Sequence, residues 1–401
     1  MNILLVSRCP PFPIYFGDRL IVYHLAQELS ARRHHIDLLA FCDRPEEAAN
    51  IPRYERFFRY IKLVQKPATS PLGYLGRLGG GFFPGRAAAA WSPEMWRAIE
   101  ERLRVGAYDL VQLFGGVQVY EYRALVRALP NIIVPYESYS LYLKNALAAE
   151  GNAPRRLRMR LQAVVARQYE RRMFAGFERV IVLTASDAAA LRELDPTLTP
   201  TIIPNGVDTD YFVATEFEPA EPTLIFTGNF EYEPNLEAAL RLVKSIFPMV
   251  RSRVPGAKLL LVGYKPPLAL LNAARADVEI VGSVPDMRPY LERALIYVSP
   301  LVKGAGIKNK LLEAMAMQKP LVATPLSMEG IAARNGEHVL LAESDDEFAR
   351  AIVKLVKDKT LRRRLAANAR ALIDHQYTWK HVAAQYEALY KQLAGHSDRK
   401  P

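Results

Sequence analysis

The sequence has few cysteines and no long apolar segment. Cys9 and Cys42 are the only cysteines among 401 residues, which excludes a disulfide framework or a cysteine-rich metal site and favours a reducing compartment. No uncharged apolar run reaches about 18 residues, so we expect no segment that crosses a bilayer. The amino-terminal run MNILLVSRCPPFP has no basic residue before its apolar part, and prolines interrupt it. This predicts a first strand and not a signal peptide.

Two common phosphate-binding motifs are missing as well. The Walker sequence GxxxxGK followed by Ser or Thr does not occur, and no GxGxxG follows the first predicted strand. ATPases and ordinary nicotinamide dehydrogenases are therefore disfavoured.

The charge that is present is basic and unevenly distributed. The chain carries a net charge of +11 at pH 7. Residues 1–203 hold 27 Lys and Arg against 19 Asp and Glu, whereas the remaining residues hold 26 against 23. The excess in the first half fits an anionic membrane surface, an anionic acceptor or nucleic acid, and composition does not choose among these.

Short apolar runs alternate with helical patterns along the chain. In the first half they are NILLV, HIDLLAF, RYIKLV, DLVQLF, NIIVPY and RVIVLT, and in the second half TLIFTG, KLLLVG, VEIVG, ALIYVSP and PLVAT. This alternation predicts parallel strands joined by right-handed crossovers. We therefore expect two doubly wound α/β domains over 1–203 and 204–376, followed by a C-terminal helix and tail over 377–401.

Two helix starts are predicted from capping residues. Apolar residues between positions 236 and 250 follow helical spacing, which predicts one continuous helix from Asn235, as its N-cap, to Arg251. Ser344 and Glu347 form a capping-box pattern ahead of FARAIVKLV. We favour that interpretation of this acidic cluster over a metal site.

The segment KGAGIKNKLLEAMAMQKPLVAT (303–324) places three lysines beside glycines at a predicted helix start. The first turn of a helix has unpaired N–H groups and the positive end of the dipole, so it favours anions. Lys303, Lys308 and Lys310 therefore indicate an anion that is not part of the chain. Glu313 lies on a different side of this helix from the predicted buried stripe. That stripe consists of Leu311, Leu312, Met315 and Ala316.

Glycines mark three predicted strand-to-helix turns, at Gly17, at Gly228, and at Gly304 with Gly306. Tandem α/β domains bind ligands at the carboxyl edges of their sheets, so we expect a site in the cleft between those edges. Glycine lets the backbone approach a phosphate without an intervening Cβ. Each glycine alone also fits an ordinary turn, but their coincidence with lysines indicates a phosphate site.

Four segments of the chain resemble a known protein family. IPNGVDTDYF, FTGNFEYEPNLEAA, GSVPDMRPYL and GAGIKNKLLEAMAMQKPLVAT are similar to glycosyltransferase family 4, the group-1 glycosyltransferases of GT-B fold, and especially to sugar transferases of bacterial exopolysaccharide systems. The resemblance covers nearly all of the second domain. It extends more weakly to PPFPIYFGDR and RVIVLTASDAAAL in the first.

The resemblance implies two Rossmann-like domains that face each other across a cleft. It also implies a retaining, metal-independent hexosyltransferase that moves a sugar from a nucleotide-sugar donor to a glycan or lipid-linked acceptor. The nucleotide-sugar is a co-substrate, so no cofactor is expected, nor is nucleic acid a partner. The expected role is in the biosynthesis of cell-surface polysaccharide or exopolysaccharide. The protein is expected to act in the cytoplasm, and if it is a peripheral membrane protein it would lie at the inner face of the cell membrane.

The same resemblance assigns roles to individual residues. Glu313 matches the carboxylate that accepts hydrogen bonds from the ribose hydroxyls, which suits a vicinal diol. The backbone near Val284 matches the loop that contacts the base. Gly17 matches the glycine that admits the diphosphate and donor sugar to the first domain.

The donor-binding pattern departs from the family in two places. Ala305 replaces the first glutamate of the E-x7-E pair, which leaves the identity of the donor sugar open. Many members have Gly-Arg followed by a lysine where this chain has Gly228 and Asn229. We therefore expect Lys308 or Lys310 to supply the charge that holds the diphosphate, with a solvated helix face as the alternative.

A third departure concerns catalysis. Many members place a histidine after a first-domain strand, near the anomeric carbon of the donor, but all seven histidines here lie elsewhere. The corresponding segment NIIVPYESYS offers Tyr136 and Glu137. Glu137 is the candidate catalytic residue, which would orient the acceptor hydroxyl or support charge at the reacting carbon. A structural or capping role is the alternative.

A D-x-D pattern, a glycine-rich segment and an arginine-rich segment have other possible functions. Asp208 and Asp210 resemble a metal motif but follow PNG in the connector, so no metal site is predicted. Residues 71–91 form either a linking loop or a lid or lipid-touching loop with Phe82, Phe83 and Trp91. Residues 155–173 form a basic amphipathic helix with seven arginines. This helix is packed in the first domain with a solvated basic face, or it docks on an anionic membrane surface, with nucleic-acid binding as the least favoured alternative.

Two other functions stay open. One is a nucleotide-sugar 2-epimerase-like isomerase, because such enzymes share the GT-B fold. The other is a degenerate transferase that acts as a scaffold, which Ala305 and the missing histidine favour.

Overall fold

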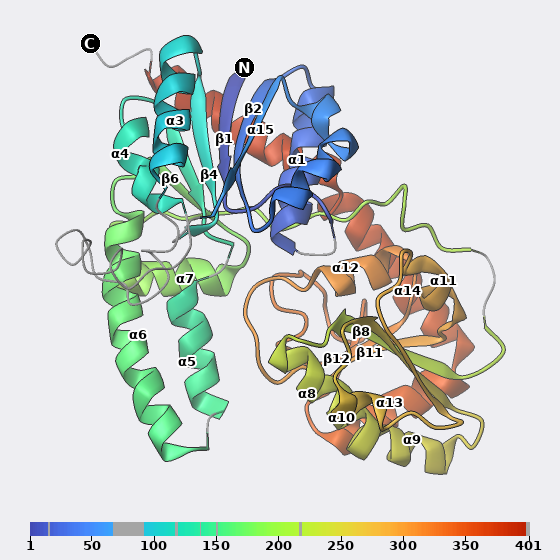
Figure 1. Ribbon diagram of the computed structural model, residues 1–401. Helices are drawn as coiled ribbons and strands as arrows, with labels where there is room; N and C mark the ends of the chain where they lie inside the picture. The colour runs from blue at the N-terminus through green and yellow to red at the C-terminus, as the bar shows by residue number, and fades with distance from the viewer. Residues whose placement is uncertain are drawn as a thin grey trace. The chain divides into compact units, whose positions relative to one another are not determined.

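The computed structural model divides into two compact units (Figure 1). It describes residues 1–14, 17–66, 92–116, 119–136, 138–149, 151–215 and 219–397. The first unit consists of Met1–Asn205 together with Trp379–Pro401, and the second of Gly206–Thr378. The C-terminal helix therefore belongs to the first unit, although it follows the second in the chain.

The first unit contains a seven-stranded parallel sheet in the order β3-β2-β1-β4-β5-β6-β7. Its strands are β1 (Asn2–Ser7), β2 (His35–Cys42), β3 (Tyr60–Gln65), β4 (Leu110–Phe114), β5 (Asn131–Val134), β6 (Arg179–Val182) and β7 (Thr201–Ile202). The strand order changes direction between β1 and β4. The loops after these two strands thus lie where doubly wound sheets bind ligands.

The α-helices described in the first unit include the C-terminal one. They are α1 (Gly17–Ala31), α3 (Pro93–Val105), α4 (Arg123–Val126), α5 (Tyr139–Ala149), α6 (Ala153–Phe174), α7 (Ala185–Leu194) and α15 (Trp379–Ser397). α15 packs against α1, where the rings of His24 and Trp379 stack with centroids 5.1 Å apart. Tyr390 on α15 also donates a hydrogen bond to Gln112 on β4. Helix α15 is therefore part of the core of the first unit.

The second unit contains a six-stranded parallel sheet in the order β10-β9-β8-β11-β12-β13. Its strands are β8 (Thr223–Asn229), β9 (Lys258–Tyr264), β10 (Val278–Val281), β11 (Ile296–Ser299), β12 (Leu321–Ala323) and β13 (Leu340–Leu341). Side chains of β8 alternate between two cores, with Leu224 and Phe226 in one and Ile225 in the other. Burial on both faces explains why its strands read as nearly continuous apolar runs.

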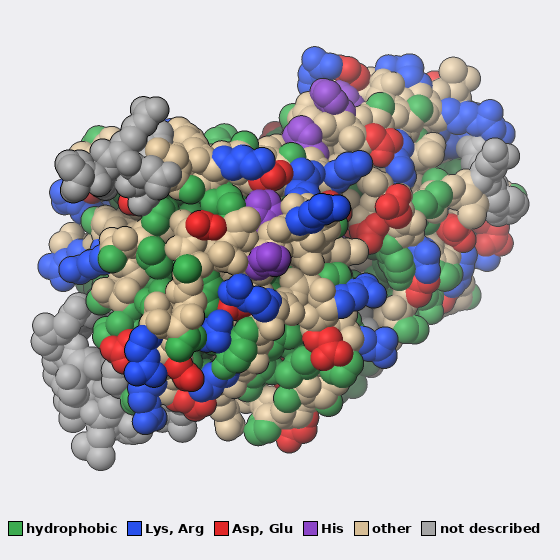
Figure 2. All heavy atoms as spheres, turned by 90° about the horizontal axis from the view of Figure 1, so that it is seen from above, with side chains coloured by type: hydrophobic (Ala, Val, Ile, Leu, Met, Phe, Trp, Pro, Cys, Tyr) green, Lys and Arg blue, Asp and Glu red, His purple; other side chains and the backbone are tan. Residues whose placement is uncertain are grey.

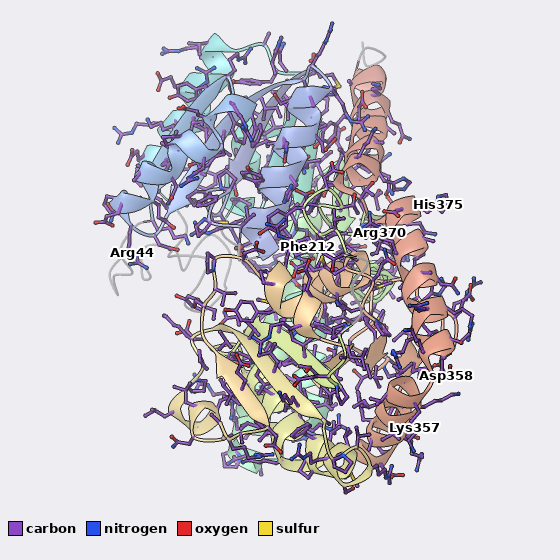
Figure 3. All side chains as sticks on the ribbon, turned by 90° about the vertical axis from the view of Figure 1, so that its right-hand side faces the viewer. Arg44, Phe212, Lys357, Asp358, Arg370 and His375 are labelled. Atoms are coloured by element: carbon purple, nitrogen blue, oxygen red, sulfur yellow. The ribbon has the colours of Figure 1, made fainter. Side chains whose placement is uncertain are left out.

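The helices described in the second unit are α8 (Glu233–Arg241), α9 (Phe247–Arg253), α10 (Leu268–Leu271), α11 (Arg288–Arg293), α12 (Asn309–Ala316), α13 (Asp345–Lys357) and α14 (Lys359–Gln376). The predicted capping box at the start of α13 is present, with Ser344 and Glu347 as its two members. The end of α12 is stabilised by α14, because Arg370 donates a hydrogen bond to the carbonyl of Ala316 (2.8 Å) and another to that of Phe212 (3.2 Å; Figure 3).

The predicted helix from Asn235 to Arg251 is wrong in its start but is confirmed as one uninterrupted helical run, from Glu233 to Arg253. α8 begins at Glu233 with Tyr232 as N-cap, since Pro234 fits a first helical turn. A π-helical turn, Leu242–Ile246, joins α8 to α9 within this run. Asn235 is thus not an N-cap, and its side chain makes contacts beyond its own helix.

Candidate functional site

Most predicted site residues of the second unit meet at the carboxyl edge of its sheet. β8 and β11 are parallel neighbours, so the turn after Gly228 and the loop with Gly304 and Gly306 lie at the same edge. Side chains join the two segments. The Lys310 ammonium on α12 donates a hydrogen bond to Asn235 Oδ1 on α8 over 2.6 Å.

Different structural constraints explain why glycine occupies each of these positions at the edge of the sheet. Gly304 (φ 124°) and Gly306 (φ 70°) adopt left-handed conformations that other residues rarely adopt, which explains both in the loop before α12. Gly228 lies in β8, where its Cβ position would be 3.0 Å from the Asn235 side chain. Sequence reasoning missed Gly263 on β9, where a Cβ would lie 1.7 Å from the Gly228 carbonyl oxygen. Close approach of the two strands requires a glycine at position 263.

Two of the lysines before α12 are paired with carboxylates of the chain itself. Lys303 forms an ion pair with Glu237 over 2.8 Å. Lys308 is buried, forms an ion pair with Glu329 over 3.2 Å and donates a hydrogen bond to the Gly306 carbonyl over 2.5 Å. Lys303 and Lys308 therefore have carboxylate partners within the chain, and their role toward an external anion stays a prediction. Their partners lie far along the sequence, so no local pattern shows them.

Among the described residues, Lys310 has no carboxylate as its hydrogen-bond partner. Its ammonium lies 4.2 Å from the centroid of the Phe226 ring and bonds to the neutral Asn235 amide. Burial and, to a smaller extent, the charge of Lys308 lower the pKa of Lys310, the charge of Glu313 opposes both, and the net result is a pKa of about 7. Lys310 is thus a half-buried cation whose charge an incoming anion would stabilise.

Glu313 lies one turn after Lys310 on α12 and is half-buried. No hydrogen bond reaches its carboxylate from the residues that the structure describes. Burial raises the pKa of Glu313 to about 7, and the charge of Lys310 counteracts this rise. A partly desolvated carboxylate without a donor is costly, so a ligand with hydroxyl donors would satisfy it.

Val284 lies in the loop after β10, two strands from β8 in the sheet. It is partly buried and packs against one of the two cores of the unit. Arg288 and Tyr211 hold this loop through Asp286, with an Arg288–Asp286 ion pair of 2.7 Å. The hydrogen bond from Arg288 lowers the pKa of Asp286 to about 2, so this carboxylate is ionised at neutral pH.

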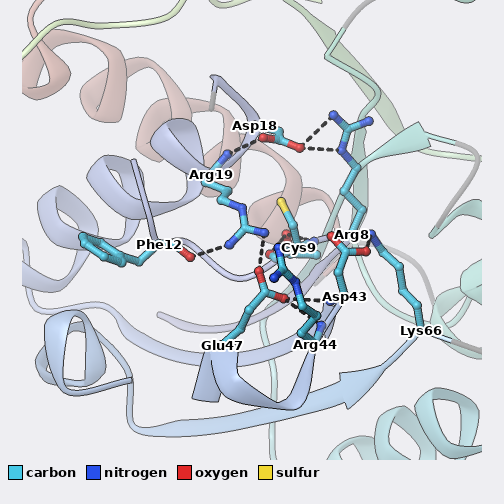
Figure 4. A network of polar contacts seen from close by, with 10 residues as sticks. Arg8, Cys9, Phe12, Asp18, Arg19, Asp43, Arg44, Glu47 and Lys66 are labelled. Atoms are coloured by element: carbon cyan, nitrogen blue, oxygen red, sulfur yellow. Dashed lines mark hydrogen bonds and ion pairs between the residues drawn. The ribbon is translucent and has the colours of Figure 1, made fainter. Parts of the chain in front are cut away.

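Gly17 lies in the first unit, at the start of α1 and next to a polar network (Figure 4). Asp18 forms an ion pair with Arg8 over 2.8 Å. Burial opposes ionisation of Asp18, but the charge of Arg8 and the hydrogen bonds from Arg8, Cys9 and the Arg19 backbone together outweigh it and lower the pKa of Asp18. Arg19 forms an ion pair with Glu47 over 2.5 Å and donates a hydrogen bond to the Phe12 carbonyl in the loop before α1. The signal that could have identified Arg8 is a charged residue directly after a buried strand.

Tyr136 has φ 73° and packs its ring under the Arg8 guanidinium, 4.8 Å from ring centroid to carbon. Glu137 lies outside the described residues, so the structure does not place the candidate catalytic carboxylate. The next residues are held by buried Glu170 on α6, whose carboxylate accepts hydrogen bonds from the backbone N–H groups of Tyr139 (2.6 Å) and Ser140 (3.2 Å). Glu170 is a further residue that the sequence did not reveal.

The D-x-D pattern serves a turn. Asp208 Oδ1 accepts hydrogen bonds from the backbone N–H groups of Asp210 (3.1 Å) and Tyr211 (2.9 Å). Within the described ranges, no group of three or more His, Cys, Asp or Glu residues is arranged to hold a metal ion. The same residues include no helix with the length and apolarity that a membrane span needs. The lid candidate 71–91 lies outside the described residues.

Two family models match the chain, one over each half. Residues 20–211 match the model described as Glycosyltransferase Family 4. Residues 221–358 match the model described as Glycosyl transferases group 1. The second match contains β8, α12 and every predicted site residue of the second unit.

Similar sequences and structures agree with these matches. An uncharacterized 44.6 kDa protein in the cps region of Klebsiella pneumoniae is 20% identical over 98% of this chain and 99% of its own length. Phosphatidyl-myo-inositol mannosyltransferase of Mycobacterium tuberculosis is 30% identical over 48% of this chain and 54% of its own length.

Solved structures share the fold over the whole chain. Sucrose-phosphate synthase from Thermosynechococcus elongatus has a TM-score of 0.76 at 18% identity, with 98% of this chain and 99% of that chain covered. HepE of Anabaena, solved in complex with UDP and glucose, has a TM-score of 0.64 at 13% identity, with 98% and 100% covered. At these identities the likeness shows the fold, two parallel-sheet α/β units of GT-B type.

Proposed function

Since this chain belongs to the group 1 glycosyltransferases of family 4, we propose that it transfers a sugar from a nucleoside diphosphate donor to an acceptor hydroxyl. The observation that supports this reaction best is the Glu313 carboxylate, which is half-buried and accepts no hydrogen bond from the described residues. A ribose offers two adjacent hydroxyl donors, and a carboxylate is their natural acceptor. Glu313 is thus proposed to bind the ribose.

The proposed diphosphate position is the start of α12. In the transfer, the bond between the anomeric carbon and the diphosphate oxygen breaks, and a bond to the acceptor oxygen forms as the acceptor hydroxyl loses its proton. Negative charge grows on the leaving diphosphate. The N–H groups of the first turn of α12, the loop with Gly304 and Gly306, and the Lys310 ammonium would stabilise that charge. Lys308, which already has Glu329, would act through the shape of this loop.

The remaining assignments extend the proposal. The backbone near Val284 would contact the base. Gly17 would admit the diphosphate and donor sugar, and Glu137 would orient the acceptor. Retention of anomeric configuration without a required metal is part of the proposal, and the turn role of Asp208 supports the absence of a D-x-D metal site.

The acceptor and setting are proposed from the relatives. The likeness to a phosphatidyl-myo-inositol mannosyltransferase supports a lipid-linked or glycan acceptor. The likeness to a protein of a cps region supports a role in cell-surface or exopolysaccharide biosynthesis. The free thiols of Cys9 and Cys42, both buried, support the cytoplasm as the place of action.

Product analysis by mass spectrometry tests the reaction. The purified chain is incubated with UDP-, GDP- and ADP-sugars, with and without a bacterial lipid and glycan extract. A transferase releases nucleoside diphosphate and forms a glycosylated product only with the extract. Conversion of the donor sugar without extract would instead support the isomerase, and no binding or conversion of any donor would support the scaffold.

Two variants make this test specific to the site. Glu313→Ala removes the proposed ribose acceptor and should abolish product formation. Glu343→Ala removes an exposed carboxylate of the same unit and should leave product formation unchanged. Equal product from wild type and Glu313→Ala would overturn the assignment of Glu313.

A further inference from the structure

Helix α6 exposes apolar side chains that the described residues do not cover. Leu157, Leu161 and Val164, here called the apolar stripe, are 60%, 64% and 68% exposed. At about 100° per residue, these three positions fall on one side of the helix. The buried residues of α6 fall on the opposite side and towards its C-terminal end: Ala166, Tyr169, Glu170, Met173 and Phe174. The sequence pattern suggested one apolar face on this helix. The structure instead has two apolar faces on α6, an exposed one formed by the apolar stripe and a buried one on the opposite side.

The exposed side of α6 carries positive charge and no negative charge. Arg158, Arg160 and Arg167 are exposed along the same helix as the apolar stripe. The one acidic residue of α6 is Glu170, which is buried against the start of α5. Helix α5 has no acidic residue in its sequence. The α5–α6 pair thus combines exposed apolar and cationic groups.

The absence of exposed acidic side chains on α6 differs from the mixed charge on the face that Figure 2 shows. On the face that Figure 2 shows, Lys and Arg side chains are interspersed with Asp, Glu and uncharged side chains. Net charge alone therefore does not mark a docking surface. The α5–α6 pair also extends away from the sheet of the first unit (Figure 1), and residues 151–158 at its turn are exposed. A broad, flat partner could reach the stripe without displacing the other described elements of that unit.

We infer that α6 is a docking surface for an anionic lipid bilayer. The apolar stripe would enter the boundary between headgroups and acyl chains, and the arginines would contact anionic headgroups. Charge complementarity favours an anionic surface. The three exposed apolar side chains favour lipid over nucleic acid, which is bound chiefly through its phosphates. This binding requires neither a nucleotide-sugar donor nor an acceptor. The membrane inference can therefore be tested independently of the proposed sugar transfer.

Vesicle sedimentation with the full chain tests the inference. Wild type is mixed with phosphatidylcholine vesicles and with vesicles in which a third of the lipid is phosphatidylglycerol, in the absence of nucleotide and acceptor. Wild type should bind the anionic vesicles and not the neutral ones. Replacing the whole apolar stripe by serine, in a triple variant with Leu157→Ser, Leu161→Ser and Val164→Ser, should reduce the affinity for anionic vesicles about tenfold or more. Arg158→Gln, Arg160→Gln and Arg167→Gln should reduce it about fivefold for each arginine replaced.

Matched controls change similar side chains elsewhere. Val105→Ser with Leu268→Ser removes apolar side chains that are 62% and 75% exposed, and Arg104→Gln with Arg364→Gln removes exposed charges. Both controls should bind anionic vesicles as wild type does. Far-ultraviolet circular dichroism establishes that every variant is folded.

Several results would overturn the inference. These are no binding to anionic vesicles, equal binding to neutral and anionic vesicles, or equal loss in the control variants. Binding to single-stranded DNA that the serine variant retains, without binding to vesicles, would also contradict it and would identify a nucleic-acid surface instead.

Discussion

The Lys310 ammonium and the Asn235 side-chain oxygen lie 2.6 Å apart and join the start of α12 to α8. The two residues are distant in sequence, but β8 and β11 are parallel neighbours and bring them to one sheet edge. Asn235 also donates a hydrogen bond from its amide nitrogen to the Asn229 carbonyl over 2.9 Å. One amide thus fixes both the glycine turn after β8 and the lysine of the proposed phosphate site.

Replacement of Asn235 by leucine should destabilise the second unit. The substitution would leave the half-buried Lys310 ammonium without an acceptor and the Asn229 carbonyl without its donor. We expect a loss of about 1–3 kcal/mol in the free energy of unfolding, measured by urea denaturation. Asn235→Asp keeps an acceptor for Lys310 and should lose less. An unchanged free energy for Asn235→Leu would contradict the role assigned to this contact.

The Lys310 and Glu313 pair should give the stability of the second unit an unusual dependence on pH. Glu313 has a pKa raised from 4.5 to about 7, so between these values the folded state binds more protons and stability falls as pH rises. Lys310 has a pKa lowered from 10.5 to about 7, so above pH 7 the folded state binds fewer protons and stability rises. Together the two groups predict a minimum near pH 7.

Single variants separate the two contributions to this minimum. Glu313→Gln should remove the fall on the acid side, and Lys310→Met should remove the rise on the alkaline side. Each change in the free energy of unfolding should be about 1–3 kcal/mol, because partial exposure screens both groups. Thermal unfolding across the pH range, with Glu343→Gln as control, measures both. Parallel curves for wild type and Glu313→Gln below pH 7 would be inconsistent with a raised pKa.

Gly263→Ala should be far more damaging than Gly256→Ala. A Cβ at position 263 would lie 1.7 Å from the Gly228 carbonyl oxygen, whereas nothing lies within 4 Å of the Cβ position at Gly256. We expect Gly263→Ala to cost about 3 kcal/mol or more and Gly256→Ala to change the free energy by about 0.5 kcal/mol or less. Urea denaturation of both proteins measures the difference, and similar values for the two would refute the close approach of β8 and β9.

Asp18→Asn should destabilise the first unit in a pH-dependent way. It removes the charge that faces Arg8, and because both side chains are partly exposed we expect a cost of about 1–3 kcal/mol at neutral pH. The pKa of Asp18 is lowered below 3.8, so its contribution is present above that value and is lost as pH falls. The difference between wild type and Asp18→Asn should therefore shrink in acid. A difference that stays constant down to pH 3 would show that the charge is not its cause.

The fold could be predicted from the sequence because its strands are buried on both faces. Runs such as TLIFTG and KLLLVG have consecutive apolar residues at their centres, as parallel strands beneath helices must have, and they form β8 and β9. The burial of Leu311, Leu312, Met315 and Ala316 on α12 is also confirmed. The start of α8 was missed because Pro234 was a stronger signal for the first turn than Asn235 was for a cap.

The polar partners of the site could not be predicted, because tertiary structure supplies them. Glu329 reaches Lys308 from the loop after β12, and Glu237 reaches Lys303 from α8. Neither pair has a sequence spacing that indicates contact. The same holds for Glu170, which holds the turn before α5 from a helix thirty residues onward. The position of Glu313 relative to Lys310 was predictable, since both lie on one helix three residues apart.

Calorimetric titration with UDP, GDP and ADP tests the central claim, that Glu313 on α12 binds the ribose of a nucleoside diphosphate. We predict that wild type binds one of the three, that Glu313→Ala weakens this binding about tenfold or more, and that Glu343→Ala binds as wild type does. The claim would be contradicted if wild type bound none of the three, or if Glu313→Ala bound the preferred nucleotide with unchanged affinity.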